Sequence, residues 1–381
     1  MDVAALHQDQ RNPDGQGMEE ESTFVQTNLV SDGFLPAQTI DPNLVNPWGV
    51  SYPPKGPFWV SDNNSGAATN TPSVVTIYTG AGSPVTVAGH TAITIAPPPG
   101  QTTSAPTGQV FNVAGSGFDI SNGTTKAPSV FIFATEDGTI SGWNPAVNSG
   151  SSVIAVDNSN GGAGAVYKGL AIAKTDDGTL LFAANFRNGT VDVFNQQFKQ
   201  VNSFTDHHLP PGFAPFNVQV LDGHLFVTFA LQNAEKHDDV AGAGNGFVDE
   251  FDLHGHLLHR VASQGQLDSP WGLAIAPKSF GEFAGDLLVG NFGDGTIDVF
   301  DPHRNNHFLG KLLGPNGAPI VIGDLWALIP GNGGPNSDPN TIFFTAGVQN
   351  EAHGLFGSLT AVPQPEDRPH MSMMGAHSTH G

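Results

Sequence analysis

The sequence contains no cysteine among its 381 residues. Disulfide bonds, cysteine-ligated zinc and thiol catalysis are therefore excluded. Basic residues are also few, because 13 Lys and Arg stand against 35 Asp and Glu and give a formal charge of −22. A field of that sign repels phosphate backbones, so we expect no nucleic-acid partner.

Long apolar runs and helical patterns are missing as well. No run of about 18 apolar residues is present to span a membrane, and no long window shows the period of about 3.6 residues that marks an amphipathic helix. The first residues, MDVAALHQDQ, lack the basic and apolar regions of a signal peptide. What is abundant is 48 Gly and 29 Pro, spread among short apolar runs. This pattern indicates many turns between short strands, so we expect an all-β chain.

Two segments of the chain are close copies of one another. They are Leu181–Phe194 (LFAANFRNGTVDVF) and Leu287–Phe300 (LLVGNFGDGTIDVF). Each has an apolar strand, a polar turn with glycine and a second, alternating strand, which is the pattern of a β-hairpin. Weaker copies lie at residues 58–78, 131–143, 225–252 and 342–359, the third of them with a long insertion. The chain therefore carries six hairpins.

A short apolar strand precedes each hairpin. Residues 46–50 (NPWGV) and 269–273 (SPWGL) are near duplicates, and their relatives begin near Ala214, Tyr167 and Leu325. A sixth copy at residues 108–111 is placed by spacing. We expect the Trp and Phe side chains of these strands to pack between neighbouring repeats.

A fourth strand is expected after most hairpins, at residues 84–87, 153–156, 199–204, 257–261 and 308–313. The sixth hairpin has none, but the strand Phe24–Val30 at the other end of the chain is left over. We therefore predict a six-bladed β-propeller over residues 23–362, whose N-terminal strand closes the last blade and removes an open sheet edge. A β-sandwich or a solenoid is the alternative.

Both ends of the chain are polar. Residues 1–22 and 363–381 have little to bury, so we predict disordered tails, the first acidic and the second rich in His and Met. Imidazole and thioether groups of the second tail could bind copper or nickel. Its candidate ligands are His370, Met371, Met373, Met374, His377 and His380. The alternative is a flexible tail with adventitious metal affinity.

The loops between the second and third strands of blades four and six carry unusual chemistry. Each holds a carboxylate two residues before a histidine, Glu235 with His237 and Glu351 with His353, and Asp238 and Asp239 follow the first pair. These loops lie on one face of a propeller. They could hold a divalent metal such as calcium or copper, or provide general acid–base catalysis, or simply be solvated. By contrast, Asp192, Asp249 and Asp298 recur at one place in three blades, so we expect them to bond turn amides or face solvent.

The repeats resemble the NHL/YVTN class of propellers. More specifically, the chain resembles a bacterial family of uncharacterised, mostly exported six-bladed propeller proteins. The segments that carry the resemblance are residues 27–32, 41–49, 236–246, 269–272 and 351–359. The resemblance implies a six-bladed fold, an export signal in the natural precursor and an extracellular or periplasmic location. It implies no established activity.

Two classes of function follow. The first is a secreted, monomeric binding module that presents a loop-rich acidic face to a small molecule, a glycan or a protein. The second is a metal-dependent, lactonase-like hydrolase, which needs several Asp, Asn and Glu side chains converging at the inner strands. The loops that lead into the inner strands offer Asp41, Asn43 and Asn46, but no catalytic set can be assembled. Copper handling is a third possibility, in which the tail recruits the metal and the acidic face receives it.

Overall fold

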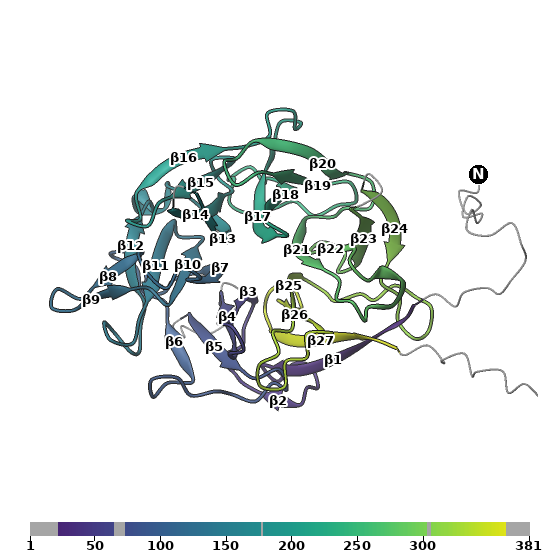
Figure 1. Ribbon diagram of the computed structural model, residues 1–381, viewed down its shortest axis with the longest axis horizontal. Helices are drawn as coiled ribbons and strands as arrows, with labels where there is room; N and C mark the ends of the chain where they lie inside the picture. Colours follow the sequence, from purple (N-terminus) through teal and green to yellow (C-terminus); the bar gives the residue numbers. More distant parts are fainter. Residues whose placement is uncertain (1–21, 65–72, 177, 303–305, 363–381) are drawn as a thin grey trace, which may run out of the picture.

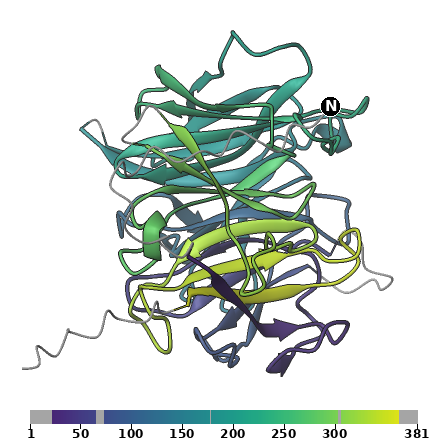
Figure 2. The ribbon, with the colours of Figure 1, turned by 90° about the vertical axis from the view of Figure 1, so that its right-hand side faces the viewer.

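Six mainly antiparallel sheets surround a central axis in this computed structural model, which describes residues 22–64, 73–176, 178–302 and 306–362. Figure 1 looks down that axis and shows the sheets as the blades of a propeller; Figure 2 shows them from the side. The first strand of each blade lies next to the axis and the last at the rim. The predicted six-bladed β-propeller is therefore confirmed.

The blades follow one another along the chain. From axis to rim, blade one consists of β3 (Pro47–Ser51), β4 (Phe58–Asp62), β5 (Val74–Tyr78) and β6 (Ala92–Thr94). Blade two consists of β7 (Pro106–Phe111), β10 (Phe131–Thr135), β11 (Thr139–Trp143) and β12 (Val153–Asp157). Blade three consists of β13 (Tyr167–Thr175), β14 (Gly178–Asn185), β15 (Thr190–Phe194) and β16 (Gln200–Phe204). Blades four and five consist of β17 (Phe213–Leu221), β18 (His224–Leu231), β19 (Gly246–Phe251) and β20 (Leu257–Ser263); and β21 (Pro270–Ile275), β22 (Leu287–Asn291), β23 (Ile297–Asp301) and β24 (His307–Lys311). Blade six consists of β25 (Leu325–Pro330), β26 (Ile342–Ala346), β27 (Leu355–Ala361), β1 (Phe24–Ser31) and β2 (Thr39–Ile40).

A few short elements lie outside the blades. The strands β8 (Asp119–Ser121) and β9 (Lys126–Pro128) form a separate hairpin, and two single-turn 3-10 helices cover Asn160–Gly162 and Gly281–Phe283. Within the described residues, no helix has the length and apolar character needed to cross a membrane.

The two ends of the chain meet in blade six. Strand β1 pairs antiparallel with β27, with Phe24 opposite Ala361 and Ser31 opposite Leu355. Purple β1 lies beside yellow β27 in both Figure 1 and Figure 2. The predicted closing strand is thus confirmed. Ser22, which the prediction assigned to the tail, is also buried, and its Oγ accepts a hydrogen bond of 3.1 Å from the Glu282 amide.

The repeated hairpins fold as their turn residues dictate. In blades three and five the turn glycines, Gly189 and Gly295, have positive φ angles of 71° and 72°, a conformation that only glycine adopts without strain. The asparagine that ends the second strand then donates a hydrogen bond of 2.9 Å to the recurrent aspartate, Asn185 to Asp192 and Asn291 to Asp298. The recurrent aspartates were expected to bond turn amides or to face solvent; instead they are buried, and Asp192 and Asp298 accept hydrogen bonds from these asparagine side chains.

The predicted outer strand of blade one was also wrong. It was placed at residues 84–87, but the rim strand is β6. Pro84 has no amide hydrogen to donate to a sheet. The Val87 amide bonds instead to the carbonyl of His90, through a tight turn in which Ala88 and Gly89 have positive φ angles. Pro84 forms an isolated bridge with Tyr78 at the end of β5, and the segment then turns back on itself.

Aromatic side chains close the central channel. Every inner strand has an irregular register near its start, a bulge that redirects a side chain. Trp48 stacks on Trp326 with 3.5 Å between ring centroids, and its ring lies 6.2 Å from Trp271 and 6.5 Å from Phe216. These residues come from blades one, four, five and six, so they pack across the axis rather than only between neighbours.

Candidate functional site

The candidate site lies at one mouth of this channel, on the face that carries the loops between second and third strands. Loops of blades two, four and six reach it, as does the segment that leads into β3 of blade one. We call this region the channel mouth and define it by Asn46, Asn63, Glu136, Lys168, His237, Asp238, Asp239 and Glu351. The loop between β4 and β5 of blade one contributes Asn63, and its residues 65–72 lie outside the described part of the chain.

Lys168 is the centre of the channel mouth. It stands near the start of β13, where other blades place Trp48, Phe216, Trp271 or Trp326, and it is only 1% exposed. Its ammonium group forms an ion pair with Glu136 Oε1 and lies 3.7 Å from Asp238 Oδ1. Burial alone would lower the pKa of Lys168, but the carboxylates of Glu136, Asp238 and Asp239 outweigh burial and raise it. The lysine therefore carries a fixed positive charge.

Aromatic rings also lie around the ammonium group of Lys168. The Lys168 nitrogen lies 4.8 Å from the centroid of the Trp48 ring, 5.7 Å from that of Phe186 and 5.9 Å from that of Phe216. Rings at such distances attract a cation through their negative faces. The aromatic cluster that closes the channel thus also forms the floor of the site.

Glu136 is held on two sides. It lies in the tight turn between β10 and β11 and is 7% exposed. Its Oε1 contacts Lys168, while its Oε2 accepts a hydrogen bond of 2.9 Å from Asn63 Nδ2 of blade one. The neighbouring Asp137 accepts a hydrogen bond of 2.7 Å from the Ala105 amide. The turn is fixed in place, so Glu136 is positioned before any ligand arrives.

The insertion of blade four folds over the channel mouth. Its start is anchored by Gln232, whose side chain contacts the carbonyl of Phe186. Asn233 then organises the turn: its Oδ1 accepts a hydrogen bond of 3.0 Å from the His237 amide, and its own amide donates one of 2.8 Å to the Asp238 carbonyl. The insertion is therefore a folded loop that carries His237 and Asp238 to the site.

Glu136, His237 and Asp238 form a compact group. One ligand atom from each of these side chains lies within 4.8 Å of the other two. His237 Nδ1 lies 2.8 Å from Asp238 Oδ1, and this contact raises the pKa of His237 and lowers that of Asp238. Burial raises the pKa of the next residue, Asp239. An imidazole and two carboxylates at this spacing are a possible ligand set for a metal ion.

Glu351 approaches the group from blade six. Its Oε2 accepts a hydrogen bond of 2.6 Å from Asn46 Nδ2, and Asn46 Oδ1 accepts one of 3.0 Å from the indole nitrogen of Trp326. Burial, followed by repulsion from Glu136, raises the pKa of Glu351 to about 7. The carboxyl group is therefore able to take up or release a proton near neutral pH.

The remaining candidates from the sequence lie elsewhere. His353 faces the segment that follows β1: its Nδ1 lies 2.6 Å from Asp32 Oδ2, and its ring stacks on that of Phe34 with 4.1 Å between centroids. Glu235 is exposed on the insertion. The tail candidates, His370, Met371, Met373, Met374, His377 and His380, lie outside the described residues. The structure thus brings together His237, Asp238, Asp239 and Glu351 from the predicted set.

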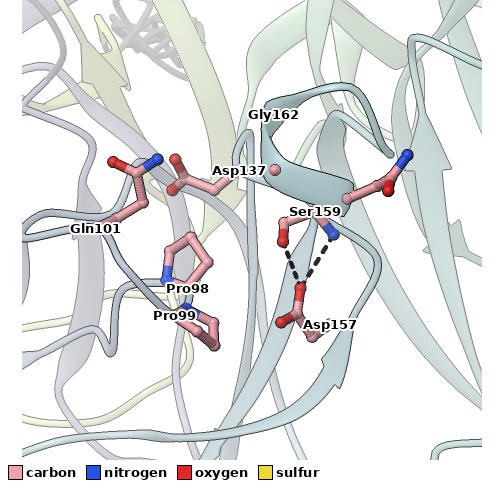
Figure 3. Close-up of a pocket in the computed structure, with 9 residues that line it drawn as sticks. Pro98, Pro99, Gln101, Asp137, Asp157, Ser159 and Gly162 are labelled. Carbon is pink, nitrogen blue, oxygen red and sulfur yellow. Dashed lines mark hydrogen bonds between the residues drawn. The ribbon is translucent and has the colours of Figure 1, made fainter.

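A cavity of about 400 Å³ lies beside the channel mouth. Figure 3 shows Pro98 and Pro99 on one wall, Gln101 and Asp137 above them, and Ser159 with Asp157 opposite. Asp157 Oδ1 accepts hydrogen bonds of 3.0 Å from the Ser159 amide and 2.5 Å from its hydroxyl. Asp137, which lines this cavity, directly follows Glu136 in the chain. A second cavity, of about 280 Å³, lies further along the inner strands and is mainly apolar.

Sequence reasoning missed the roles of Lys168 and Glu136. A signal was present: a lysine stands at a strand position where Trp48, Phe216 and Trp271 stand in other blades. A buried charge at an apolar position requires a partner, and that requirement could have pointed to the acidic loops.

Comparison with curated proteins places the chain in a family. Uncharacterized protein R648 of Acanthamoeba polyphaga mimivirus is 31% identical over 338 residues, which cover 87% of this chain and 78% of the viral protein. Uncharacterized protein L690 of the same virus is 31% identical over 345 residues, which cover 89% and 86%. The chain belongs to the family of these viral proteins. The bacterial origin and the export that the sequence resemblance implied stay predictions.

Solved structures agree with the fold. A streptogramin B lyase superposes with a TM-score of 0.50 over 90% of this chain and 98% of its own, at 11% identity. A protein of unknown function from Bacteroides thetaiotaomicron superposes with a TM-score of 0.50 over 90% of this chain and 77% of its own, at 10% identity. Similarity at such low identity supports the propeller architecture alone. No protein-family model matches the chain.

Proposed function

We propose that this propeller is a binding module that takes a divalent cation at the channel mouth through Glu136, His237 and Asp238. The observation that carries the proposal is the convergence of one ligand atom from each of these residues within 4.8 Å. They come from two different blades, so the fold, and not a single loop, creates the group. Loops on a rigid frame are where propellers and other scaffolds commonly place binding residues.

The chemistry of the three ligand groups limits which metal ions they would favour. Calcium prefers six to eight oxygen ligands, whereas one imidazole with two carboxylates suits zinc, manganese or another first-row ion. Copper(I) prefers thiolate and thioether ligands, and the three groups here are nitrogen and oxygen donors. We therefore favour a zinc- or manganese-like ion over calcium or copper(I).

Metal analysis and calorimetry test the proposal. The full chain with His370, His377 and His380 replaced by alanine is stripped with a chelator, and Zn²⁺ or Mn²⁺ is then titrated into it. We expect stoichiometric binding that is weakened at least tenfold by His237→Ala. The matched control is His353→Ala, which removes a histidine at Asp32 and Phe34 and leaves binding unchanged. Equal affinities in the two variants, or no binding by the parent protein, would contradict the proposal.

A hydrolase is the second candidate, because Glu351 at the same mouth is buried and has its pKa raised to about 7. A carboxyl group with such a pKa suits general acid–base catalysis near neutral pH. The experiment measures hydrolysis of a panel of lactones by the parent protein, Glu351→Gln and Glu250→Gln, in which Glu250 is a carboxylate of blade four. Loss of turnover in Glu351→Gln alone supports this function, and absence of turnover throughout excludes it for this substrate class.

A further inference from the structure

We propose that Lys168 is a built-in competitor of the cation: its ammonium group occupies the cation position of the channel mouth and limits the affinity for metal ions. The inference rests on the proposed function and adds a residue that tunes it. Its basis is geometric, because Lys168 contacts Glu136 and lies 3.7 Å from Asp238, two of the three metal-ligand candidates.

The surroundings of the ammonium group are those of a cation-binding site. Carboxylates lie on one side, and the faces of Trp48, Phe186 and Phe216 lie within 5.9 Å on the other. Carboxylates with aromatic faces form a common recognition site for ammonium ligands. Here the protein itself supplies the ammonium group, on a side chain that is 1% exposed.

The position of Lys168 in the fold makes the arrangement specific. Its equivalents in blades one, four, five and six are the aromatic residues that fill the channel, so an apolar side chain is the ordinary solution at this place. The long stem of Lys168 passes among these rings, and only its end reaches the carboxylates. An apolar side chain of similar length can therefore fill the same space without the charge.

Competition follows from electrostatics. A metal ion bound by Glu136 and Asp238 would lie next to a positive charge that already neutralises them, and like charges repel one another, most strongly beside the buried Glu136. Removal of the charge therefore has two consequences. It leaves two carboxylates without a buried cation, which destabilises the metal-free protein, and it strengthens their affinity for an added ion.

The test compares Lys168→Met with the parent protein and with Lys311→Met. Lys311 also pairs with two carboxylates, Asp294 at 3.1 Å and Asp298 at 3.8 Å, but in blade five. The two substitutions change the net charge equally, so the control removes long-range effects. Calorimetric titration of Zn²⁺ and Mn²⁺ is made on chelator-treated full chains that lack the three tail histidines. Thermal unfolding is measured with and without the ion.

We expect Lys168→Met to bind the ion at least tenfold more tightly than the parent, and its Tm to rise more on adding the ion. Lys311→Met should match the parent in both measurements. Equal or weaker binding by folded Lys168→Met overturns the inference while leaving the proposed function intact. Binding by Lys168→Met but not by the parent supports the inference and overturns the proposed function, and binding by neither overturns both.

A folding defect is handled by a second variant. Lys168→Gln keeps polar contacts with Glu136 but carries no charge, and the same tighter binding is expected of it. If both variants remain unfolded even with excess ion, the inference is wrong, because the ion should then replace the missing charge.

Discussion

Asn46 Nδ2 donates a hydrogen bond of 2.6 Å to Glu351 Oε2, although 305 residues separate the two in the chain. The bond joins the segment before blade one to the loop of blade six. Asn46 is fully buried, and its φ angle of 47° lies in the left-handed region, which asparagine tolerates better than most residues. Its oxygen also accepts the indole hydrogen of Trp326. One side chain thus links the closure of the ring, the aromatic cluster and the candidate site.

Asn46→Ala is expected to destabilise the protein. It leaves Glu351 and Trp326 without a buried partner, and each unsatisfied group costs about 1–3 kcal/mol. The measurement is the free energy of unfolding in urea. Asn43→Ala, which removes a side-chain bond at an exposed position three residues earlier, is the control and should change little. A similar loss in both variants would mean that Asn46 has no special role.

The ion pair between Lys168 and Glu136 is expected to behave as a buried pair. Breaking it from either side, with Lys168→Met or Glu136→Gln, leaves an uncompensated charge and should cost about 3–5 kcal/mol. The double variant should cost much less than the sum of the two, because both charges are then absent. Urea unfolding of the four proteins in chelator gives the coupling energy. Additive losses would show that the two side chains act independently.

The sequence was sufficient to predict the ring because its evidence is local. The hairpins 181–194 and 287–300 repeat both an alternating pattern and a glycine turn, and such signals depend on residues close together in the chain. The leftover strand Phe24–Val30 then had one place to pair. The prediction of the rim strand of blade one failed, because residues 84–87 lead into a local turn. Apolar composition alone does not distinguish such a turn from a strand.

The candidate site was predictable only in part, for a different reason. The loops of blades four and six could be assigned to one face from topology, and Glu351 of blade six lies close enough to Asp239 of blade four for its pKa to respond to that charge. The contact of Lys168 with Glu136 depends on how two blades pack against each other, and no local sequence pattern around either residue predicts it. His353 contacts Asp32 and Phe34 instead of the candidate site, and these two residues follow β1 near the other end of the chain.

Asp298 is expected to make stability depend on pH. Burial raises its pKa from 3.8 to about 6 in the folded protein. The folded state therefore holds the proton more tightly than the unfolded state, so stability falls as pH rises from about 4 to 6 and is level above that range. A difference of two pKa units corresponds to about 3 kcal/mol.

Asp298→Asn tests this dependence, because asparagine can still accept the hydrogen bond from Asn291 without carrying a charge. We expect the variant to gain stability relative to the parent at pH 7 and to lose this advantage at pH 4. Asp222→Asn, at an exposed turn with a φ angle of 48°, should follow the parent at both pH values. Unchanged pH dependence in Asp298→Asn would refute the assignment.

The closing strand is expected to contribute through one side of β1. Phe24 is fully buried and its ring lies 4.6 Å from that of Phe280 and 6.1 Å from that of Phe283, in the core of blades five and six. Val25 is the next residue and is 41% exposed, because successive side chains of a strand point to opposite faces. Phe24→Ala should cost about 3–5 kcal/mol, while Val25→Ala should change stability by less than about 1 kcal/mol.

Both variants keep the backbone pairing with β27, so the comparison isolates side-chain packing from strand closure. Unfolding in urea measures the two costs, and hydrogen exchange of the β27 amides shows where the loss is felt. If packing of Phe24 holds the ring closed, amide hydrogen exchange in Phe24→Ala should accelerate more in blade six than in blade three. Equal acceleration in all blades would instead indicate a ring that opens as one unit.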